Sequence, residues 1–387
     1  MRIIAAATLL FGIFSPSATP SSAGQLPKEN VGKNLSTIFG GMASANAPGL
    51  AVLVKKDGKA IFEQGYGVRD LRTKQPVDTQ TNFRLASLTK QFTAMAIMLL
   101  VHDGDLRYDE TLTQIFPEFP AYGRAITIRN LLNHTSGLPD YEELMAVDEK
   151  AKETIIWSPE HQIRDAEVLE LLKKATHGKF APGTNWEYSN SGYVVLGLIV
   201  SKVSGKPFAD FLRERIFLPL KMDHTLVFAK GENEIPNRAY GHSKRSGVFI
   251  ETDQSSTSAT QGDGGIYSNL EDLSRWDDAL RHRTLLSEKE FQAALTPPRL
   301  PAGAERKLAE DAPESMRGRA IAYGFGWFLD LGSTHPLMWH YGETMGFKTA
   351  IQRYTRDRLT IIILSNRTDL DPSSLALKVS HLFLKTH

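Results

Sequence analysis

The runs that predict β-strands lie at the two ends of this 387-residue chain, and the long segment between them reads as helices and loops. Two β-rich runs, 50–54 and 60–66, flank Asp57-Gly58, a dipeptide typical of a tight hairpin turn. Further strand-like runs follow at 323–329, 337–340, 347–354 and 359–364. This order predicts an α/β (α+β) fold, in which an antiparallel sheet built from both chain ends and flanked by helices carries an inserted all-helical domain.

The segment between these runs sets the expected domain boundaries. Residues 106–256 contain short helical patterns and no strong strand pattern, so they are predicted to form the helical domain. The sheet domain is then expected to comprise 24–105 and 257–387, with a buried helix from Ser87 to Gly104 and a last helix at 373–384. We expect the functional site in the cleft where the two domains meet.

The first 23 residues predict a secretory signal peptide. Basic Arg2 precedes an apolar stretch, and small residues end at Ala23, so the mature chain is expected to start near Gly24, in the periplasm or outside the cell. The alternative, a buried first helix, is disfavoured by Pro16 and Pro20. The absence of cysteine excludes disulfides and thiol catalysis. A net charge of +1 gives no reason to expect a nucleic-acid partner, and no later segment predicts a stable membrane anchor.

Ser87-Leu88-Thr89-Lys90 places a hydroxyl and an amine three positions apart at the predicted start of a helix. The two side chains would lie on one helix face and could meet. A serine hydroxyl becomes a good nucleophile when a nearby base takes its proton, and a lysine serves as that base when its surroundings keep it neutral. The alternative is that Ser87 only caps the helix, but a capping box would carry Glu or Gln at position 90.

Tyr188-Ser189-Asn190 presents a phenol and an amide from one loop. Tyr188 could relay a proton between Ser87 and a leaving group, and Asn190 could donate to a substrate carbonyl. The structural alternative is that Asn190 caps the following helix while Tyr188 packs beneath it. In a second Tyr-x-Asn, at 267–269, Ser268 and Glu271 have capping-box spacing, which predicts a helix start without a catalytic role.

The segment from Trp339 to Phe347 combines a strand-like run with glycines. Gly342 would let the backbone approach a bound acyl group, and the N–H of Glu343 could join that of Ser87 in an oxyanion hole. His340 would then face the pocket, although a single histidine is more often structural. We expect neither a metal nor another cofactor, because metal-ligand spacings such as His-x-x-x-His do not occur.

In this order, Ser87-x-x-Lys90, Tyr188-x-Asn190 and His340-x-Gly342 resemble the three motifs of serine hydrolases related to class C β-lactamases and D-alanyl-D-alanine carboxypeptidases. The resemblance spans about Ala47 to the C-terminus and includes the similar segments 134–141, 182–183, 262–267 and 364–366. It implies a β-lactamase/transpeptidase-like fold and an acyl-enzyme on Ser87. It further implies that Lys90 and Tyr188 share the acid and base work, that Asn190 orients the substrate, and that the N–H groups of Ser87 and Glu343 hold the oxyanion.

Two departures from the family pattern affect the expected substrate. Many penicillin-hydrolysing relatives carry lysine at the place of His340, so efficient β-lactam hydrolysis is not expected. Glu343 replaces a glycine common in the His-x-Gly version, and its carboxylate could attract a substrate amine or simply point to solvent.

We therefore expect a hydrolase of ester or amide bonds in small peptides, D-amino-acid derivatives or acyl esters. The alternatives are a penicillin-binding or sensing protein with little or no turnover, and a cell-wall scaffold with a vestigial pocket. The sequence leaves the oligomeric state open.

Overall fold

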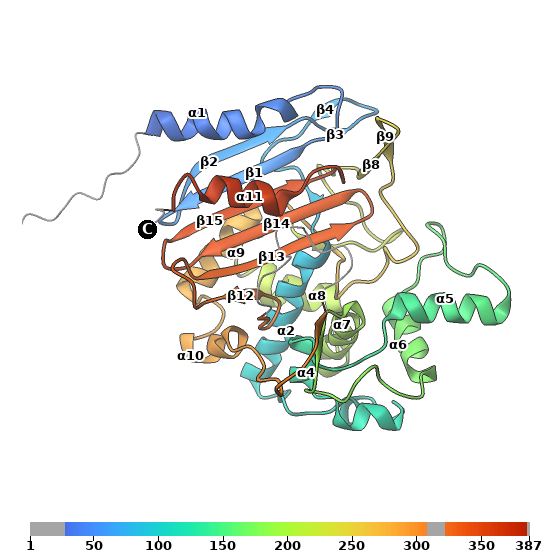
Figure 1. Ribbon diagram of the computed structural model, residues 1–387. Helices are drawn as coiled ribbons and strands as arrows, with labels where there is room; N and C mark the ends of the chain where they lie inside the picture. The colour runs from blue at the N-terminus through green and yellow to red at the C-terminus, as the bar shows by residue number, and fades with distance from the viewer. Residues whose placement is uncertain (1–27, 308–321, 385–387) are drawn as a thin grey trace, which may run out of the picture.

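A six-stranded antiparallel sheet forms the centre of the computed structural model, which describes residues 28–307 and 322–384. The strand order is β12 (Phe328–Asp330), β13 (Leu337–Thr344), β14 (Phe347–Tyr354), β15 (Leu359–Ser365), β1 (Leu50–Lys56) and β2 (Lys59–Tyr66) (Figure 1). Strand β15 pairs with β1 over its whole length, from Leu50 opposite Ser365 to Lys56 opposite Leu359. The prediction of an antiparallel sheet built from both chain ends is therefore confirmed.

Local sequence explains the hairpin of β1 and β2. Asp57 and Gly58 adopt φ values of 53° and 79°, the two positive values that a tight turn of this type requires. Strand β1 is buried on both sides because it lies inside the sheet between helical layers. Its side chains alternate between two apolar clusters, with Ala51 and Leu53 in one and Leu50, Val52 and Val54 in the other.

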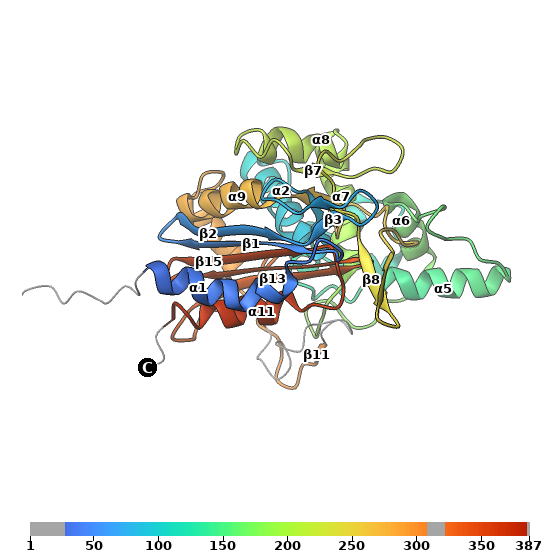
Figure 2. The same ribbon diagram turned by 90° about the horizontal axis from the view of Figure 1, so that it is seen from above.

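Helices cover both faces of this sheet (Figure 2). On one face lie α1 (Lys28–Phe39) and α11 (Pro372–Ser380), which contribute Leu35, Phe39 and Val379 to a shared apolar cluster. On the other face lie α2 (Lys90–Asp103) and α9 (Leu270–His282). Helix α2 is buried around its whole circumference over Lys90–Leu100, and Gly104, at φ 84°, ends it as predicted.

The helical region packs against α2 through α7 and α8. Its helices are α3 (Leu112–Ile115), α4 (Ile128–Leu132), α5 (Tyr141–Lys152), α6 (Asp165–Lys174), α7 (Asn190–Ser204) and α8 (Phe208–Leu212), and α10 (Glu288–Phe291) follows later in the chain. Short turns of other helix types are η1 (Gly40–Met42), η2 (Ala86–Thr89), η3 (Ala121–Ala125), η4 (Arg213–Phe217) and η5 (Gln292–Leu295). One apolar cluster contains side chains of both the sheet and these helices, so the cleft side of the sheet is continuous with the helical region.

The helical region also contains strands that the sequence patterns did not predict. The hairpin of β8 (His242–Arg245) and β9 (Val248–Glu251) turns at Ser246 and Gly247, both with positive φ. Its alternation was missed because most of its side chains are polar or exposed. The other small pairings are β3 (Val68–Asp70) with β4 (Gln75–Pro76), β11 (Arg306–Lys307) with β6 (Trp186–Glu187), and β10 (Ile266–Ser268) between β5 (Phe83–Arg84) and β7 (Leu226–Val227).

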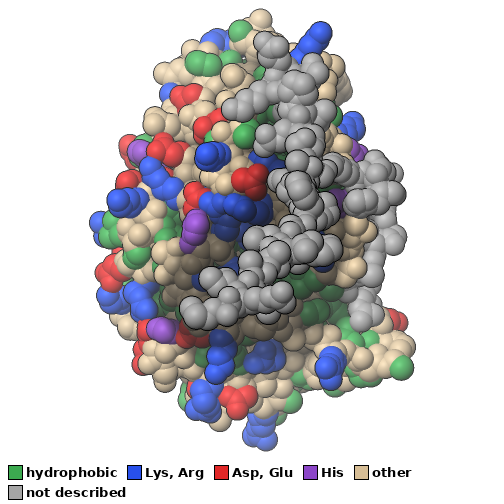
Figure 3. All heavy atoms as spheres, turned by 90° about the vertical axis from the view of Figure 1, so that its left-hand side faces the viewer, with side chains coloured by type: hydrophobic (Ala, Val, Ile, Leu, Met, Phe, Trp, Pro, Cys, Tyr) green, Lys and Arg blue, Asp and Glu red, His purple; other side chains and the backbone are tan. Residues whose placement is uncertain are grey.

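Two predictions concern the ends of the chain, the signal peptide and the last helix. The predicted signal peptide at 1–23 lies outside the described residues. The last helix ends at Ser380, earlier than predicted, where the Ser380 hydroxyl donates back to the Leu377 carbonyl at 2.8 Å. Among the described residues, no helix combines the length and apolarity that crossing a membrane requires. On the face seen in Figure 3, basic and acidic side chains are interspersed.

Candidate active site

Ser87 lies in the turn η2, directly before α2, which begins at Lys90. The sequence predicted that the helix starts at Ser87, but residues 86–89 form a 3₁₀ turn, in which positions three apart lie one above the other. Lys90 Nζ consequently donates to Ser87 Oγ at 2.9 Å. The preceding residue, Ala86, adopts a left-handed φ of 50°, a strained value for alanine that is typical of functional turns.

The side chain of Lys90 is fully buried, at 0% exposure, whereas Ser87 is half-buried. Besides Ser87, Lys90 Nζ donates to Asn190 Oδ1 at 2.8 Å and to the Asp263 carbonyl at 3.0 Å. The Tyr188 ring lies 5.0 Å from the same nitrogen, within the range of a cation–π interaction. This arrangement places a reachable hydroxyl next to an amine that water does not reach.

The loop before α7 brings Tyr188 and Asn190 to this lysine. Ser189, and not Asn190, caps α7, because its hydroxyl accepts the Gly192 N–H at 3.1 Å. The side chain of Asn190 does not cap the helix, and its oxygen accepts a hydrogen bond from Lys90 Nζ instead. The capping role considered for Asn190 is therefore wrong, and the structure brings Ser87, Lys90, Tyr188 and Asn190 together.

His340 projects from β13 into an aromatic cluster next to these residues. Its ring centre lies 6.2 Å from that of Tyr188, and its Nε2 is 2.9 Å from the Tyr323 hydroxyl. Its Nδ1 lies 2.6 Å from the Tyr341 carbonyl, so Nδ1 carries the proton and Nε2 accepts from Tyr323. Burial and the Lys90 charge lower the pKa of His340 to about 3. At neutral pH His340 is therefore an uncharged ring.

Gly342 lies where β13 crosses the turn η2. A side chain at this position would collide with the Leu85 carbonyl and the Thr349 hydroxyl, and its Cβ would lie 3.1 Å from the Ser87 nitrogen. The Thr349 hydroxyl donates to the same Leu85 carbonyl at 2.8 Å, which ties β14 to the turn. This close contact with the turn places residues 342–343 of β13 beside Ser87, and the approach to a bound acyl group stays a prediction.

Glu343 forms an ion pair with Lys348, its partner residue on β14, at 2.9 Å. The side chain of Glu343 is 26% exposed to solvent, so it lies at the rim of the site. The Lys348 ammonium partly neutralises the carboxylate that the sequence suggested as a site for a substrate amine.

The second Tyr-x-Asn begins a helix, as predicted, but with a different cap. Asn269, and not Ser268, is the N-cap of α9, because its side-chain oxygen accepts the Asp272 N–H at 2.9 Å. The Ser268 hydroxyl lies 2.7 Å from that of Thr225 instead. The Tyr267 hydroxyl contacts Arg238 at 3.2 Å.

Two residues of the site carry no functional signal in their own sequence pattern. Tyr323 binds His340, and His134 is buried against Tyr188 with ring centres 4.5 Å apart. His134 stands in a segment similar to the family, but its role was not predicted, and Tyr323 was only expected to begin a strand. Both contacts join residues far apart in the chain.

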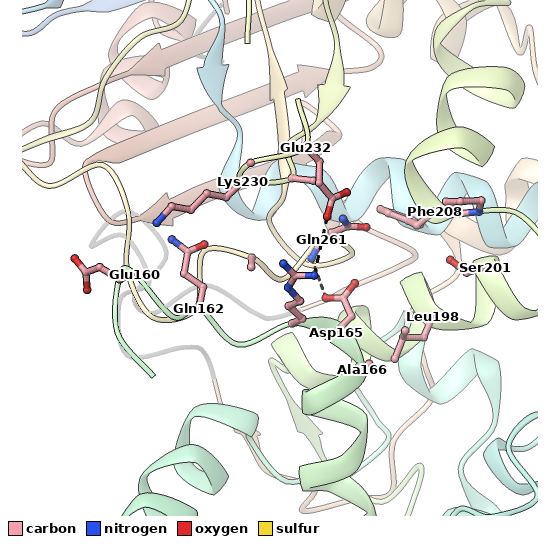
Figure 4. A pocket seen from close by; sticks show the side chains of 15 residues that line it. Glu160, Gln162, Asp165, Ala166, Leu198, Ser201, Phe208, Lys230, Glu232 and Gln261 are labelled. Atoms are coloured by element: carbon pink, nitrogen blue, oxygen red, sulfur yellow. Dashed lines mark hydrogen bonds and ion pairs between the residues drawn. The ribbon is translucent and has the colours of Figure 1, made fainter. Parts of the chain in front are cut away.

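A separate cavity of about 590 Å³ is lined by residues of the segments 160–166, 198–208, 229–232 and 259–261 (Figure 4). Charged Lys230 and Glu160 lie at one end of it and apolar Phe208 at the other. The predicted site residues do not line this cavity, which makes it distinct from the Ser87 centre. Within the described ranges, no group of His, Asp and Glu side chains has the geometry to hold a metal ion.

The comparisons with known proteins agree with this geometry. The sequence matches the family model described as Beta-lactamase over residues 36–381. Penicillin-binding protein 4* of Bacillus subtilis (strain 168) is 32% identical over 355 residues, which cover 88% of this chain and 73% of that protein. A penicillin binding protein from Bacillus halodurans superposes with a TM-score of 0.72 at 26% identity, covering 90% of this chain and 100% of that one.

An amide hydrolase has the same fold. The D-amino acid amidase from Ochrobactrum anthropi SV3, complexed with L-phenylalanine amide, superposes with a TM-score of 0.71 at 25% identity, covering 91% of this chain and 99% of the amidase. The family match spans almost the whole described chain, including Ser87, Lys90, Tyr188, Asn190 and His340. This chain belongs to the Beta-lactamase family and is a serine hydrolase of the β-lactamase/transpeptidase-like fold.

Proposed function

We propose that this family member is an exported hydrolase of ester or amide bonds in small peptides, D-amino acid derivatives or acyl esters, acting through an acyl-enzyme on Ser87. The observation that carries the proposal is the 2.9 Å contact between Ser87 Oγ and the fully buried Lys90 Nζ. A positioned amine next to a reachable hydroxyl is the arrangement that activates a serine.

In the proposed reaction, Lys90 in its neutral form takes the Ser87 proton as Oγ attacks the substrate carbonyl carbon. The N–H groups of Ser87 and Glu343 hold the resulting oxyanion, and Asn190 orients the substrate. The leaving alcohol or amine receives a proton through Tyr188. Water then attacks the acyl-enzyme carbonyl and gives one proton to Lys90, which is neutral again, and this proton passes to Ser87 Oγ as the carboxylic acid leaves.

The neutral state of His340 supports uncharged ester or amide substrates. A histidine with a pKa near 3 offers no positive charge to a substrate carboxylate at neutral pH. Its Nδ1 proton and Nε2 acceptor are both engaged, with Tyr341 and Tyr323. The likeness to a D-amino acid amidase favours amides of D-amino acids within this class. The export part of the proposal is supported by the sequence of residues 1–23 alone.

The second candidate is a penicillin-binding or sensing protein that acylates with little or no turnover. It is favoured by the 32% identity to a penicillin-binding protein over most of this chain. The two candidates differ in whether the acyl-enzyme is hydrolysed.

The test uses the wild type, Ser87→Ala, and the control Ser201→Ala, whose hydroxyl lies on α7. Each protein is treated with a fluorescent fluorophosphonate and a fluorescent penicillin, and then assayed on short-chain esters and D-amino acid amides. We expect labelling and turnover by the wild type and by Ser201→Ala, with loss of both in Ser87→Ala. Stoichiometric labelling without product would favour the second candidate, and equal labelling of Ser87→Ala would contradict both.

A further inference from the structure

His134 occupies the turn after α4 at the centre of the aromatic cluster. Its side chain is 1% exposed, and its ring centre lies 4.5 Å from that of Tyr188 and 4.4 Å from that of Tyr323. The residue adopts a left-handed φ of 63°. A left-handed conformation is unfavourable for a non-glycine residue, so the surrounding contacts impose this geometry.

Two hydrogen bonds connect His134 to the residues on either side of Tyr188. The Ser189 N–H donates to His134 Nδ1 at 3.1 Å, and the Glu187 N–H donates to the His134 carbonyl at 3.1 Å. The chain at Tyr188 is therefore fixed before and after the tyrosine by one residue, whose ring also packs on the tyrosine ring. Tyr188 in turn lies 5.0 Å from Lys90 Nζ.

From these contacts we propose that His134 is a positioning residue, which holds Tyr188 in place against Lys90 for proton transfer. The inference rests on the proposed function, in which Tyr188 passes the proton to the leaving group. His134 itself touches neither Ser87 nor, in the proposed reaction, the substrate.

The hydrogen bonds also explain why the residue is a histidine. Because Nδ1 accepts from a backbone N–H, the ring proton is on Nε2, and the ring must stay neutral for the contact to persist. Burial, followed by the charge of Lys90 and the nearby His340, keeps the pKa of His134 well below its usual value. At neutral pH the His134 ring is therefore uncharged, and Nδ1 accepts the hydrogen bond from the Ser189 N–H.

The chain keeps this residue despite two local costs. One is the left-handed backbone, and the other is the His134 Nε2–H, which is buried without a hydrogen-bond partner in residues 28–307 and 322–384. A buried donor without a hydrogen-bond partner lowers the stability of the folded state. Because both features lower the stability of the folded protein, stability alone does not explain a histidine at position 134. The positioning of Tyr188 does explain it.

The experiment compares three variants in the full chain. His134→Asn keeps a side-chain acceptor, and asparagine tolerates the left-handed region. His134→Gly tolerates the same backbone but has neither acceptor nor ring, and His134→Phe keeps a ring without an acceptor. We expect kcat for the chosen ester or amide to fall about tenfold to a hundredfold in the Gly and Phe variants, at little changed KM, because misplacing a catalytic group by about 1 Å has effects of this size. We expect His134→Asn to retain kcat within about threefold.

Two controls separate the possible failures. Thermal unfolding identifies a variant that does not fold, in which case the other acceptor-free variant decides. Fluorophosphonate labelling of wild-type Ser87 tests the proposed function independently of His134. The inference is overturned if a folded acceptor-free variant keeps wild-type kcat, or if His134→Asn loses as much kcat as the folded acceptor-free variants.

Discussion

Replacing Gly342 with alanine tests whether activity requires the close contact between β13 and the turn η2, which holds Ser87. The added Cβ would lie closer than 3.0 Å to the Leu85 carbonyl, a backbone atom that cannot rotate away, and 3.1 Å from the Ser87 nitrogen. Strand β13 or the turn has to move, and overpacking of this kind costs about 1–3 kcal/mol of folding free energy. The movement also separates the two proposed oxyanion donors, whose individual loss lowers kcat by about 10²- to 10³-fold in serine hydrolases.

Gly264 provides the matched control for this substitution. It faces the same turn, but a Cβ there would lie 3.8 Å from Ala86, an ordinary contact. We expect Gly264→Ala to change the free energy of unfolding by less than about 0.5 kcal/mol. The test measures thermal unfolding of both variants, and their kcat/KM for an ester that the wild type hydrolyses. Gly342→Ala with activity within about threefold of Gly264→Ala would refute the assigned backbone contact.

Three further predictions concern titratable groups. Lys90→Ala should lower the rate of Ser87 acylation by about 10²-fold or more, as measured by stopped-flow labelling, because a positioned base is removed. His340 should not titrate between pH 5 and 9, because its pKa lies near 3, so His340→Gln should change the level of activity but leave the shape of its pH profile. Burial and the Asp263 charge raise the pKa of Asp165 to about 8, above its unfolded value. Its contribution to stability is therefore lost as pH rises from about 4 through 8, and Asp165→Asn should raise Tm relative to the wild type at pH 9 more than at pH 4.

The sequence predicted the parts of the fold that depend on local patterns. The turn at Asp57-Gly58 and the apolar strands of the central sheet follow from residue types that favour one conformation. The hairpin of β8 and β9 was missed because exposed, largely polar strands leave little apolar alternation. The predicted start of α2 was three residues too early. Both a 3₁₀ turn and an α-helix place residues three apart on one face, so the Ser87–Lys90 pair does not distinguish them.

The site residues divide in a similar way. Short motifs selected Ser87, Lys90, Tyr188, Asn190 and His340, and the structure gathers these residues around the side-chain nitrogen of Lys90. His134 and Tyr323 were not selected, because their contribution is a contact with another motif and has no periodic signal of its own. The contacts of His134 with Tyr188 and of Tyr323 with His340 join separate parts of the chain, so they can be identified only once the chain is folded.

The buried amine of Lys90 donates to three uncharged acceptors at the centre of the site. The hydrogen-bond acceptors of Lys90 named above are a hydroxyl, an amide oxygen and a backbone carbonyl. The Lys90 charge lowers the pKa of both His134 and His340, so the two histidines stay neutral beside it. In the proposed reaction, Lys90 is then the group beside these neutral rings whose charge changes during acyl transfer. A lysine at position 340 would add a second buried cation, which the neutral histidine, held by Tyr323, avoids.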